Sequence, residues 1–264
     1  MGKNLISCRP GSYDGYILHA YEHLYELGIH YLEIPNPGLK GVDSFRDLLS
    51  DFPGMQVKSI QADIPITKKN PGELMQESVF EVMKALGATH LFVSFNPGNV
   101  KEKDWISRLQ QVGDIASEYG VRVILETHPP LFLNGDVGLA TMKKVNHPAI
   151  RINYDTANMY FYNKNIDAIA ELKKILQYVE GVHLKESNKK FQTWYFPGLG
   201  EGEGCIDFKS VFSLLNSRTD PGPMFGPFTI EIEGIKGEKK LTLEDVKNRV
   251  TNSVKYLRNL GVIE

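Results

Sequence analysis

The strongest constraint on the fold of this chain is a repeated alternation of short strand-like runs with amphipathic helix-like runs. The pattern of apolar residues predicts strands at Asn4–Cys8, Tyr31–Ile34, Gln56–Gln61, His90–Phe95, Arg122–Glu126, Ile150–Asp155, Gly181–Lys185 and Phe228–Glu233. Helical periodicity predicts helices at Tyr16–Leu27, Ser44–Asp51, a segment from Pro71 to Leu86, Trp105–Ala116, Val137–Val145, Ile166–Val179, Phe208–Asn216 and Leu243–Leu260. Each strand is thus followed by one helix.

Strands that alternate with helices predict a parallel sheet with crossover helices. Eight such units within 264 residues favour a closed, single (β/α)8 TIM barrel over an open doubly wound sheet. The Pro- and Gly-rich patches at Pro35–Gly38, Pro129–Gly135 and Pro221–Pro227 have the length of loops rather than of linkers. We therefore expect one barrel domain over residues 1–264.

Charge, cysteine content and the length of apolar runs indicate which partners and which cell compartment to expect. The net charge is -2 without a basic block, which argues against binding to nucleic acid or to an anionic membrane surface. Two cysteines, Cys8 and Cys205, are too few for a disulfide framework and fit a reducing compartment. The first ten residues lack the apolar run of a signal peptide, and no stretch of 18 apolar residues occurs. We expect a cytoplasmic protein, and a homo-oligomer is compatible with the sequence.

Four expected strands end in a residue that commonly carries chemistry. Glu126 ends VRVILE, Asp155 ends IRINYD, His183 lies in GVHLKE and Glu231 lies in FTIEIE. In a barrel of this kind the active site lies at the carboxyl ends of the strands. The spacing from Glu126 to Asp155 is 155 - 126 = 29 residues, and from Asp155 to His183 it is 183 - 155 = 28. Each step is about one strand–helix unit, which predicts matching levels on neighbouring strands.

Three carboxylates and one imidazole in one place repel each other unless a divalent cation lies among them. Oxygen-rich ligation with a single nitrogen favours Mn²⁺ or Mg²⁺, with Co²⁺ or Zn²⁺ as alternatives. Each residue alone has a plainer explanation, since Asp155 could cap a helix and His183 could be a satisfied core histidine. Because four such residues fall on four successive strands, we favour a metal site.

Other residues are candidates for substrate binding around this site. His128 shares a face with the metal-ligand candidate two residues before it, and Lys185 could neutralise an oxyanion or pair with Glu33 or Glu126. Trp194 and the turns of Pro197–Gly204 could form a lid. Three residues at the ends of the first three strands are expected to line the pocket: Arg9, Glu33 and Gln61.

The motifs LETH, NYDTAN, GVHLKES, PGLGEGEGCIDF and TIEIEG, taken together, resemble the sugar phosphate isomerase/epimerase family with the xylose isomerase-like TIM barrel. The resemblance covers nearly the whole chain. It implies one divalent metal ion, an acid/base pair made of Glu126 and Glu231, and the metal ligands Glu126, Asp155, His183 and Glu231. Lys189 falls where ketose 3-epimerases carry a substrate-binding arginine, and Asn158 stands where they carry a histidine.

These observations predict a metal-dependent isomerase or epimerase of a small carbohydrate or polyol ketone, working through an enediolate. A dehydratase or lyase acting on an inosose or keto sugar would use the same site. An abasic-site endonuclease shares the fold, but it would need several histidine ligands and a basic groove. A non-catalytic sugar-binding protein would keep the pocket without needing both glutamates.

Overall fold

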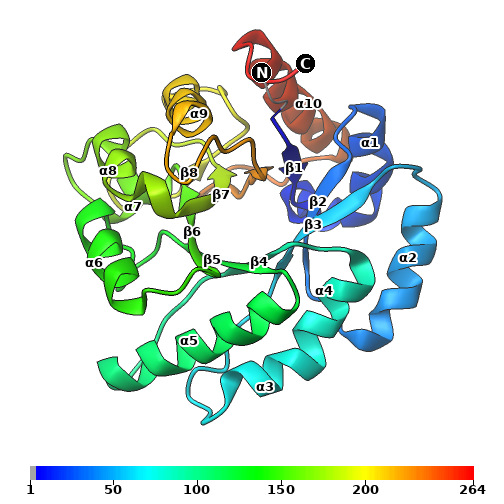
Figure 1. Ribbon diagram of the computed structural model, residues 1–264. Coiled ribbons are helices and arrows are strands. Elements are labelled where there is room, and N and C mark those ends of the chain that lie inside the picture. The colour runs from blue at the N-terminus through cyan, green and yellow to red at the C-terminus, as the bar shows by residue number, and fades with distance from the viewer. Residues whose placement is uncertain (1–3) are drawn as a thin grey trace.

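The computed structural model describes residues 4–264, and its centre is a closed barrel of eight parallel strands (Figure 1). The barrel order follows the chain order, and the last strand pairs with the first. The barrel strands are β1 (Ile6–Cys8), β2 (Tyr31–Pro35), β3 (Gln56–Gln61), β4 (His90–Val93), β5 (Arg122–Glu126), β6 (Ile150–Asp155), β7 (Val179–Leu184) and β9 (Phe228–Ile230). This arrangement confirms the expected TIM barrel.

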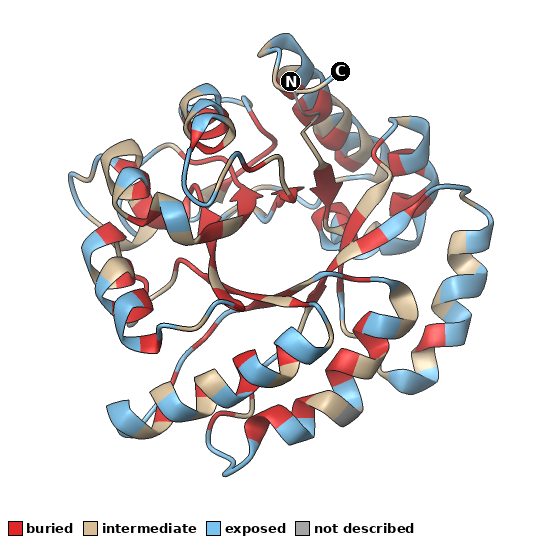
Figure 2. Cartoon of the chain, in the orientation of Figure 1, coloured by how far each residue is buried: buried red, intermediate tan, exposed pale blue. Residues whose placement is uncertain are grey.

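Helices surround the barrel and pack their apolar stripes against the outer face of the strands. They are α1 (Ala20–Glu26), α2 (Val42–Ser50), α3 (Pro71–Met75), α4 (Glu81–Leu86), α5 (Glu102–Glu118), α6 (Gly135–Val145), α7 (Asn158–Tyr162), α8 (Ala168–Ile175), α9 (Phe208–Ser217) and α10 (Leu243–Asn259), with short 3₁₀ or π segments η1 (Pro10–His19), η2 (Leu39–Gly41), η3 (Gln76–Phe80) and η4 (Leu176–Tyr178). Figure 2 shows buried residues on the strands and on the inward sides of the helices, with exposed residues outside. None of the helices within residues 4–264 has the length and apolar character needed to span a bilayer.

Alternate residues of each strand face the barrel interior, and this periodicity brings the polar strand ends together. The interior is tight below the site, because a side chain at Gly181 would overlap Asn153 and Ile124. Glycine at this position leaves room for Asn153, which lies next to it in the β6–β7 register. The interior at this level is therefore a packed core, and open space can begin only above it.

Several boundaries differ from those expected from the sequence. The first helix was expected over Tyr16–Leu27, but the chain forms the 3₁₀ segment η1 through His19 and becomes α-helical only at Ala20. The helix expected over Ile166–Val179 was wrong at its end, because Val179 already belongs to β7. Apolar residues here serve both a helix face and a buried strand, so periodicity alone does not separate the two elements.

Two features at the carboxyl ends of the strands were not expected. The short helix α7 follows β6 directly, and β8 (Tyr195–Phe196) pairs with β10 (Gly234–Ile235) in a small antiparallel sheet. That sheet joins the segment after β7 to the segment after β9. Because a two-residue strand gives no periodic signal, neither strand could be detected from apolar alternation.

Candidate metal centre and active site

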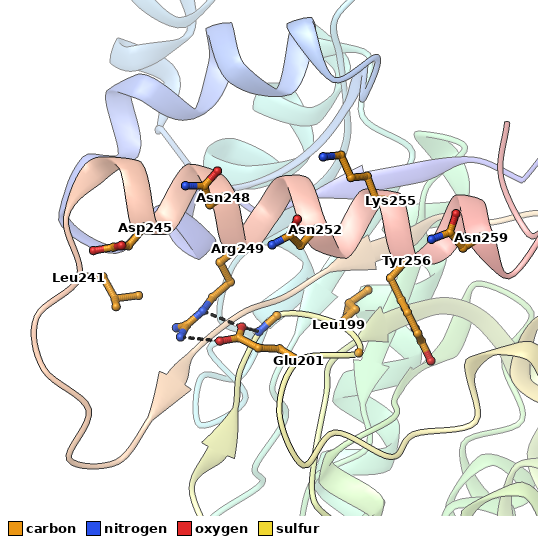
Figure 3. A pocket seen from close by; sticks show the side chains of 12 residues that line it. Leu199, Glu201, Leu241, Asp245, Asn248, Arg249, Asn252, Lys255, Tyr256 and Asn259 are labelled. Carbon is orange, nitrogen blue, oxygen red and sulfur yellow. Dashed lines mark hydrogen bonds and ion pairs between the residues drawn. The ribbon is translucent and has the colours of Figure 1, made fainter.

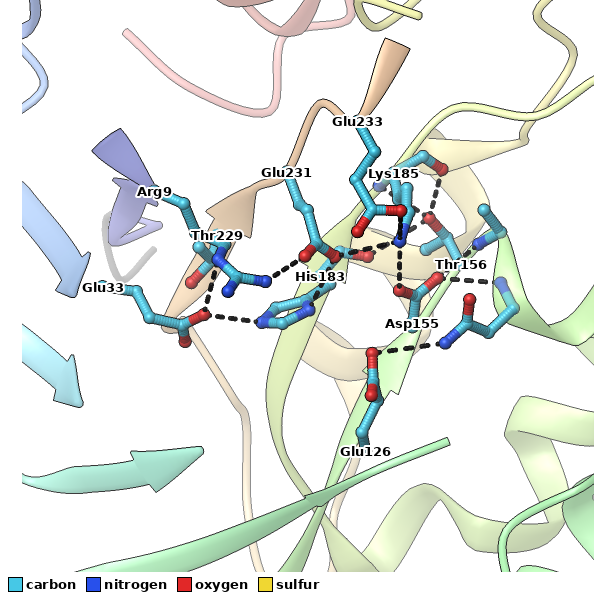
Figure 4. A network of polar contacts seen from close by, with 12 residues as sticks. Arg9, Glu33, Glu126, Asp155, Thr156, His183, Lys185, Thr229, Glu231 and Glu233 are labelled. Carbon is cyan, nitrogen blue, oxygen red and sulfur yellow. Dashed lines mark hydrogen bonds and ion pairs between the residues drawn. The ribbon is translucent and has the colours of Figure 1, made fainter. Parts of the chain in front are cut away.

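The four expected ligand residues converge at the carboxyl end of the barrel (Figure 4). One ligating atom from each of Glu126, Asp155, His183 and Glu231 can be chosen so that all four lie within 4.8 Å of one another. Glu126, Asp155 and His183 lie on β5, β6 and β7, and Glu231 directly follows β9, which is the next strand in the barrel; the strand expected over Phe228–Glu233 ends at Ile230. A common metal ion could therefore contact all four side chains.

The spacing predicted that Glu126, Asp155 and His183 lie at matching levels on neighbouring strands, and this prediction is only partly correct. Asp155 pairs in register with His183, but Glu126 pairs with Asn153, and His183 pairs with Thr229 rather than with Glu231. Barrel strands are tilted, so side chains at the same height are offset in register from strand to strand. An offset of two residues preserves the inward direction, which is why the side chains still meet.

Each ligand candidate has one atom held by the protein. Asp155 Oδ1 accepts hydrogen bonds from the backbone amides of Ala157 and Asn158, both at 2.8 Å, so the expected capping role of Asp155 at α7 is also present. The side chain of Glu231 accepts a hydrogen bond at Oε1 from Arg9. Glu126 Oε1 accepts from Asn158 Nδ2 at 3.3 Å.

Three ligating atoms of this group are buried and make no hydrogen bond. Within residues 4–264 this holds for Asp155 Oδ2, His183 Nδ1 and Glu231 Oε2. His183 Nδ1 and Glu231 Oε2 lie 3.0 Å apart without the alignment of a hydrogen bond. Two of the three, Asp155 Oδ2 and Glu231 Oε2, face the ammonium of Lys185 at 3.7 and 3.4 Å, so their charge is partly balanced. Because buried polar atoms are almost always hydrogen-bonded, the three atoms together fit a bound cation. The oxygen-rich set with one imidazole suits a divalent metal.

The pKa values of the acids reflect crowded negative charge. Burial raises the pKa of Asp155 to about 7, and the carboxylates of Glu231 and Glu126 add to this effect against Lys185. Burial, together with the charge of Glu231, also raises the pKa of Glu126. For Glu231 burial would raise the pKa, but the cations Lys185 and Arg9 and the nearby His183 hold it well below its usual range. A divalent cation would relieve this repulsion.

Lys185 is the buried cation of the site. Its ammonium lies 2.6 Å from Glu233, 3.4 Å from Glu231 and 3.7 Å from Asp155. The sequence-based alternative of a pair with Glu33 or Glu126 is therefore wrong. Burial opposes its charge, but the surrounding carboxylates raise the pKa of Lys185 above its ordinary value. Lys185 therefore balances part of the negative charge of these three acids.

Some of the other substrate-binding candidates contact the cluster formed by the four ligand candidates and Lys185, and others lie outside it. Arg9 donates hydrogen bonds to Gln61 and Glu231, so both Arg9 and Gln61 belong to it. His128 Nδ1 lies 2.7 Å from the carbonyl oxygen of Pro129 and its ring packs edge-on against an aromatic side chain of α7. Lys189 is exposed and its ammonium lies over the ring of Tyr160, outside the cluster.

Comparisons with known proteins identify the family of this fold. The family model described as the xylose isomerase-like TIM barrel matches residues 22–259. The chain belongs to this family. No curated protein matches the sequence significantly.

Solved structures that resemble this xylose isomerase-like barrel include sugar-processing proteins. D-allulose 3-epimerase from Methylomonas sp. is 20% identical with a TM-score of 0.70, covering 98% of this chain and 99% of its own. A sugar phosphate isomerase/epimerase from Parabacteroides distasonis is 14% identical with a TM-score of 0.76, covering 100% and 96%. The probable 3-DHS dehydratase AsbF from Bacillus anthracis is 13% identical with a TM-score of 0.69, covering 96% and 98%. At these identities the likeness shows the shared fold.

In this member of the family, aromatic side chains form a wall beside the cluster. Phe161 and Tyr162 of α7 pack edge to face, and Phe161 also contacts Trp194 and Phe196 of the segment after β7. Lys185 Nζ lies 4.6 Å from the centre of the Phe196 ring. Trp194 is 44% exposed, so the outer part of the aromatic wall remains accessible.

The glycine-rich loop Pro197–Gly204 is anchored on its outer side by α10, next to a cavity of about 690 Å³ (Figure 3). The guanidinium of Arg249 lies 2.9 Å from Glu201, and the hydroxyl of Ser253 accepts a 2.8 Å hydrogen bond from the amide of Leu199. This cavity lies between the loop and α10, away from the ligand candidates. The loop is thus packed against the barrel wall along its outer side.

Sequence reasoning overlooked Glu186, which holds the same loop from the inside. This carboxylate is 1% exposed and accepts three backbone hydrogen bonds, from Ser187 and Ile206 at 3.0 Å and from Gly200 at 2.7 Å. Gly204 packs so closely that a side chain there would overlap Glu186. The one available signal was an acidic residue directly before a glycine-rich loop, and it does not distinguish a solvated side chain from a buried one.

We expect Glu186→Gln to destabilise the loop. The amide replaces one acceptor oxygen by a donor, which faces backbone N–H groups that are also donors, so the free energy of unfolding should fall by about 2 kcal/mol. Urea denaturation measures that loss, and limited proteolysis should cut more rapidly within Pro197–Gly204. Glu203→Gln on the exposed side of the same loop is the matched control and should leave both measurements unchanged. Equal stability of the Glu186→Gln and parent proteins would contradict this role.

Proposed function

We propose that the protein is a divalent-metal-dependent isomerase or epimerase of a small polyhydroxylated carbonyl compound. The observation that carries the proposal is the set of three buried ligand atoms without a hydrogen bond, which belongs to a group with two glutamates, one at the end of β5 and one directly after β9. The names of similar structures, which include 3-epimerases of D-allulose and L-ribulose, support a sugar substrate. We propose Glu126, Asp155, His183 and Glu231 as the ligands, with Mn²⁺ or Mg²⁺ favoured.

A bound divalent ion would polarise the substrate carbonyl and make the neighbouring C–H more acidic. The chain itself supplies the proton transfer. Glu126 ends β5 and Glu231 directly follows β9, so one carboxylate can take the proton from the α-carbon and the other can return one on the other side. Lys185 is close enough to Glu231 and Asp155 to stabilise negative charge on a substrate oxygen there.

The surrounding residues would bind and shield the substrate. We propose that the aromatic wall around Trp194 and Phe196 excludes water and packs against the C–H faces of the sugar. His128 and Asn158 lie on the side of Glu126, where a substrate hydroxyl could reach them. Arg9 and Gln61 flank Glu231 on the opposite side. Lys189 would reach a substrate only if its side chain left the ring of Tyr160.

Proton transfer through the glutamates predicts exchange with solvent. When the Mn²⁺-loaded protein is incubated in D₂O with D-fructose, D-tagatose, L-ribulose or D-allulose, product and recovered substrate should carry deuterium on the carbon α to the carbonyl. Proton NMR and mass spectrometry measure this incorporation. Product without deuterium would indicate a hydride shift and reject the two-glutamate mechanism.

The same experiment separates the remaining functions. Loss of water from the substrate would place the protein with dehydratases, the activity suggested by the name of one similar structure. Binding of sugar without product or exchange would indicate a sugar-binding protein. An endonuclease is the least supported alternative, because the ligand group found within residues 4–264 contains one histidine.

A further inference from the structure

We propose that Glu33 is a positioning residue that determines which nitrogen of His183 faces the metal. This inference rests on the metal site proposed above. Glu33 lies on β2, across the barrel from β7, and is 1% exposed. Its Oε1 atom lies 2.9 Å from His183 Nε2, a hydrogen bond between two residues 150 positions apart in the chain (Figure 4).

The chemistry of the two partners fixes the tautomer of the histidine. A carboxylate accepts hydrogen bonds, so an imidazole that binds a metal through Nδ1 keeps its one hydrogen on Nε2, where Glu33 accepts it. Nδ1 is then the nitrogen that can offer a lone pair, and it is the nitrogen on the side of Glu231, 3.0 Å from Oε2. Without Glu33, His183 could carry its hydrogen on Nδ1 and present no lone pair to the metal.

Local structure aims Glu33 at this point. Side chains alternate along β2, so Glu33 points to the face opposite that of its two neighbours; the register shift beside it leaves the extra residue, Lys58, in β3. Leu32 and Ile34 on either side are buried in the core, whereas Glu33 turns to the barrel interior. A buried carboxylate in the middle of an apolar strand is costly unless its hydrogen bonds are well used.

The arrangement around the pair keeps it rigid. The ring of His183 packs against Phe92, with ring centres 4.4 Å apart, and is 0% exposed. Arg9 Nε lies 3.5 Å from Glu33 Oε1, farther than the imidazole nitrogen, so the arginine is the weaker of the two partners. Glu33 therefore acts mainly on His183, rather than serving only as an ion-pair partner for Arg9.

The test compares Glu33→Gln with Glu33→Leu in the full-length protein loaded with Co²⁺. Both variants lose the negative charge and have similar size, but Gln keeps an oxygen that can accept the Nε2 hydrogen. Two quantities are measured: the Co²⁺ dissociation constant, and the exchangeable imidazole N–H signal in paramagnetic proton NMR with its rate of exchange with water. Glu180→Gln, at the opposite end of β7 and paired with Arg122 and Arg151, is the matched control.

We expect Glu33→Leu to weaken Co²⁺ binding by roughly 10–100-fold and to lose the slowly exchanging N–H signal, as found for partners of metal-bound histidines. Glu33→Gln should keep the signal and recover a large part of the affinity, and Glu180→Gln should match the parent. Equal weakening in the Gln and Leu variants would show an effect of charge alone and overturn the inference. Should Glu33→Leu fail to fold, loss of the N–H signal in Glu33→Gln would likewise overturn it. A parent protein without Co²⁺ binding would instead reject the proposed metal site.

Discussion

Replacing Glu231 by Gln should lower the turnover number by roughly 100-fold or more, the effect expected for loss of a positioned acid or base. The amide keeps the size of the side chain and one oxygen for the metal and for Arg9, but it cannot take a proton. Glu126→Gln should have a similar effect from the other side of the site. The measurement is steady-state turnover at saturating Mn²⁺, so that weaker metal binding does not enter the result.

Two comparisons make this experiment decisive. Glu180→Gln removes a paired glutamate at the opposite end of the barrel and should retain the parent rate. Deuterium exchange at the substrate α-carbon should fall with turnover in Glu126→Gln or Glu231→Gln, depending on which residue takes the first proton. Should both variants turn over within a few-fold of the parent, the glutamate pair would have no role in proton transfer.

Replacing His183 by Ala should lower the affinity for Mn²⁺ by about 100-fold or more, because the only nitrogen ligand of the proposed set is lost. The parent should bind about one ion per chain. Equilibrium dialysis followed by elemental analysis gives both the stoichiometry and the dissociation constant, and circular dichroism checks that the variant is folded. The cavity left at this buried position also lowers stability, so affinity is compared at a temperature where both proteins are folded.

His147 offers a control for the loss of an imidazole. It pairs with Asp114 just before the amino end of β6, at the opposite end of that strand from Asp155, and His147→Ala should retain the affinity of the parent. Stoichiometric, tight metal binding by His183→Ala would show that this residue is not a ligand. The proposed site would then have to be reassigned.

Much of the fold could be predicted because the barrel strands are short apolar runs at regular spacing. The strand Ile150–Asp155, for example, has the expected bounds, since Asp155 ends an apolar run before a polar loop. The beginning of β7 was missed because Val179 continues the apolar pattern of the preceding helix. Helix and strand cannot be separated there by periodicity alone.

The candidate site was predictable to the level of its four converging residues, but not of their partners. A strand-end residue is visible in the sequence, whereas the partner of Lys185 depends on register and on the direction of flexible side chains. From the sequence, Glu33 or Glu126 was the alternative expectation for a partner of Lys185, and the structure places it beside Glu233, Glu231 and Asp155. Glu186 was missed for a related reason, because the amides it accepts from come from loop residues with no periodic pattern.

The small sheet formed by β8 and β10 is separate from the barrel that carries the ligand candidates. Glu126, Asp155 and His183 belong to barrel strands whose positions are fixed by their neighbours on both sides, whereas Trp194 and Phe196 belong to the segment after β7, whose strand β8 pairs with β10 outside the barrel. Substitutions or length changes in those segments can reshape the space above the barrel while the strands below keep their register. Proteins with this architecture can therefore acquire new substrates through changes in the segments after β7 and β9 while the residues at the ends of the barrel strands stay in place.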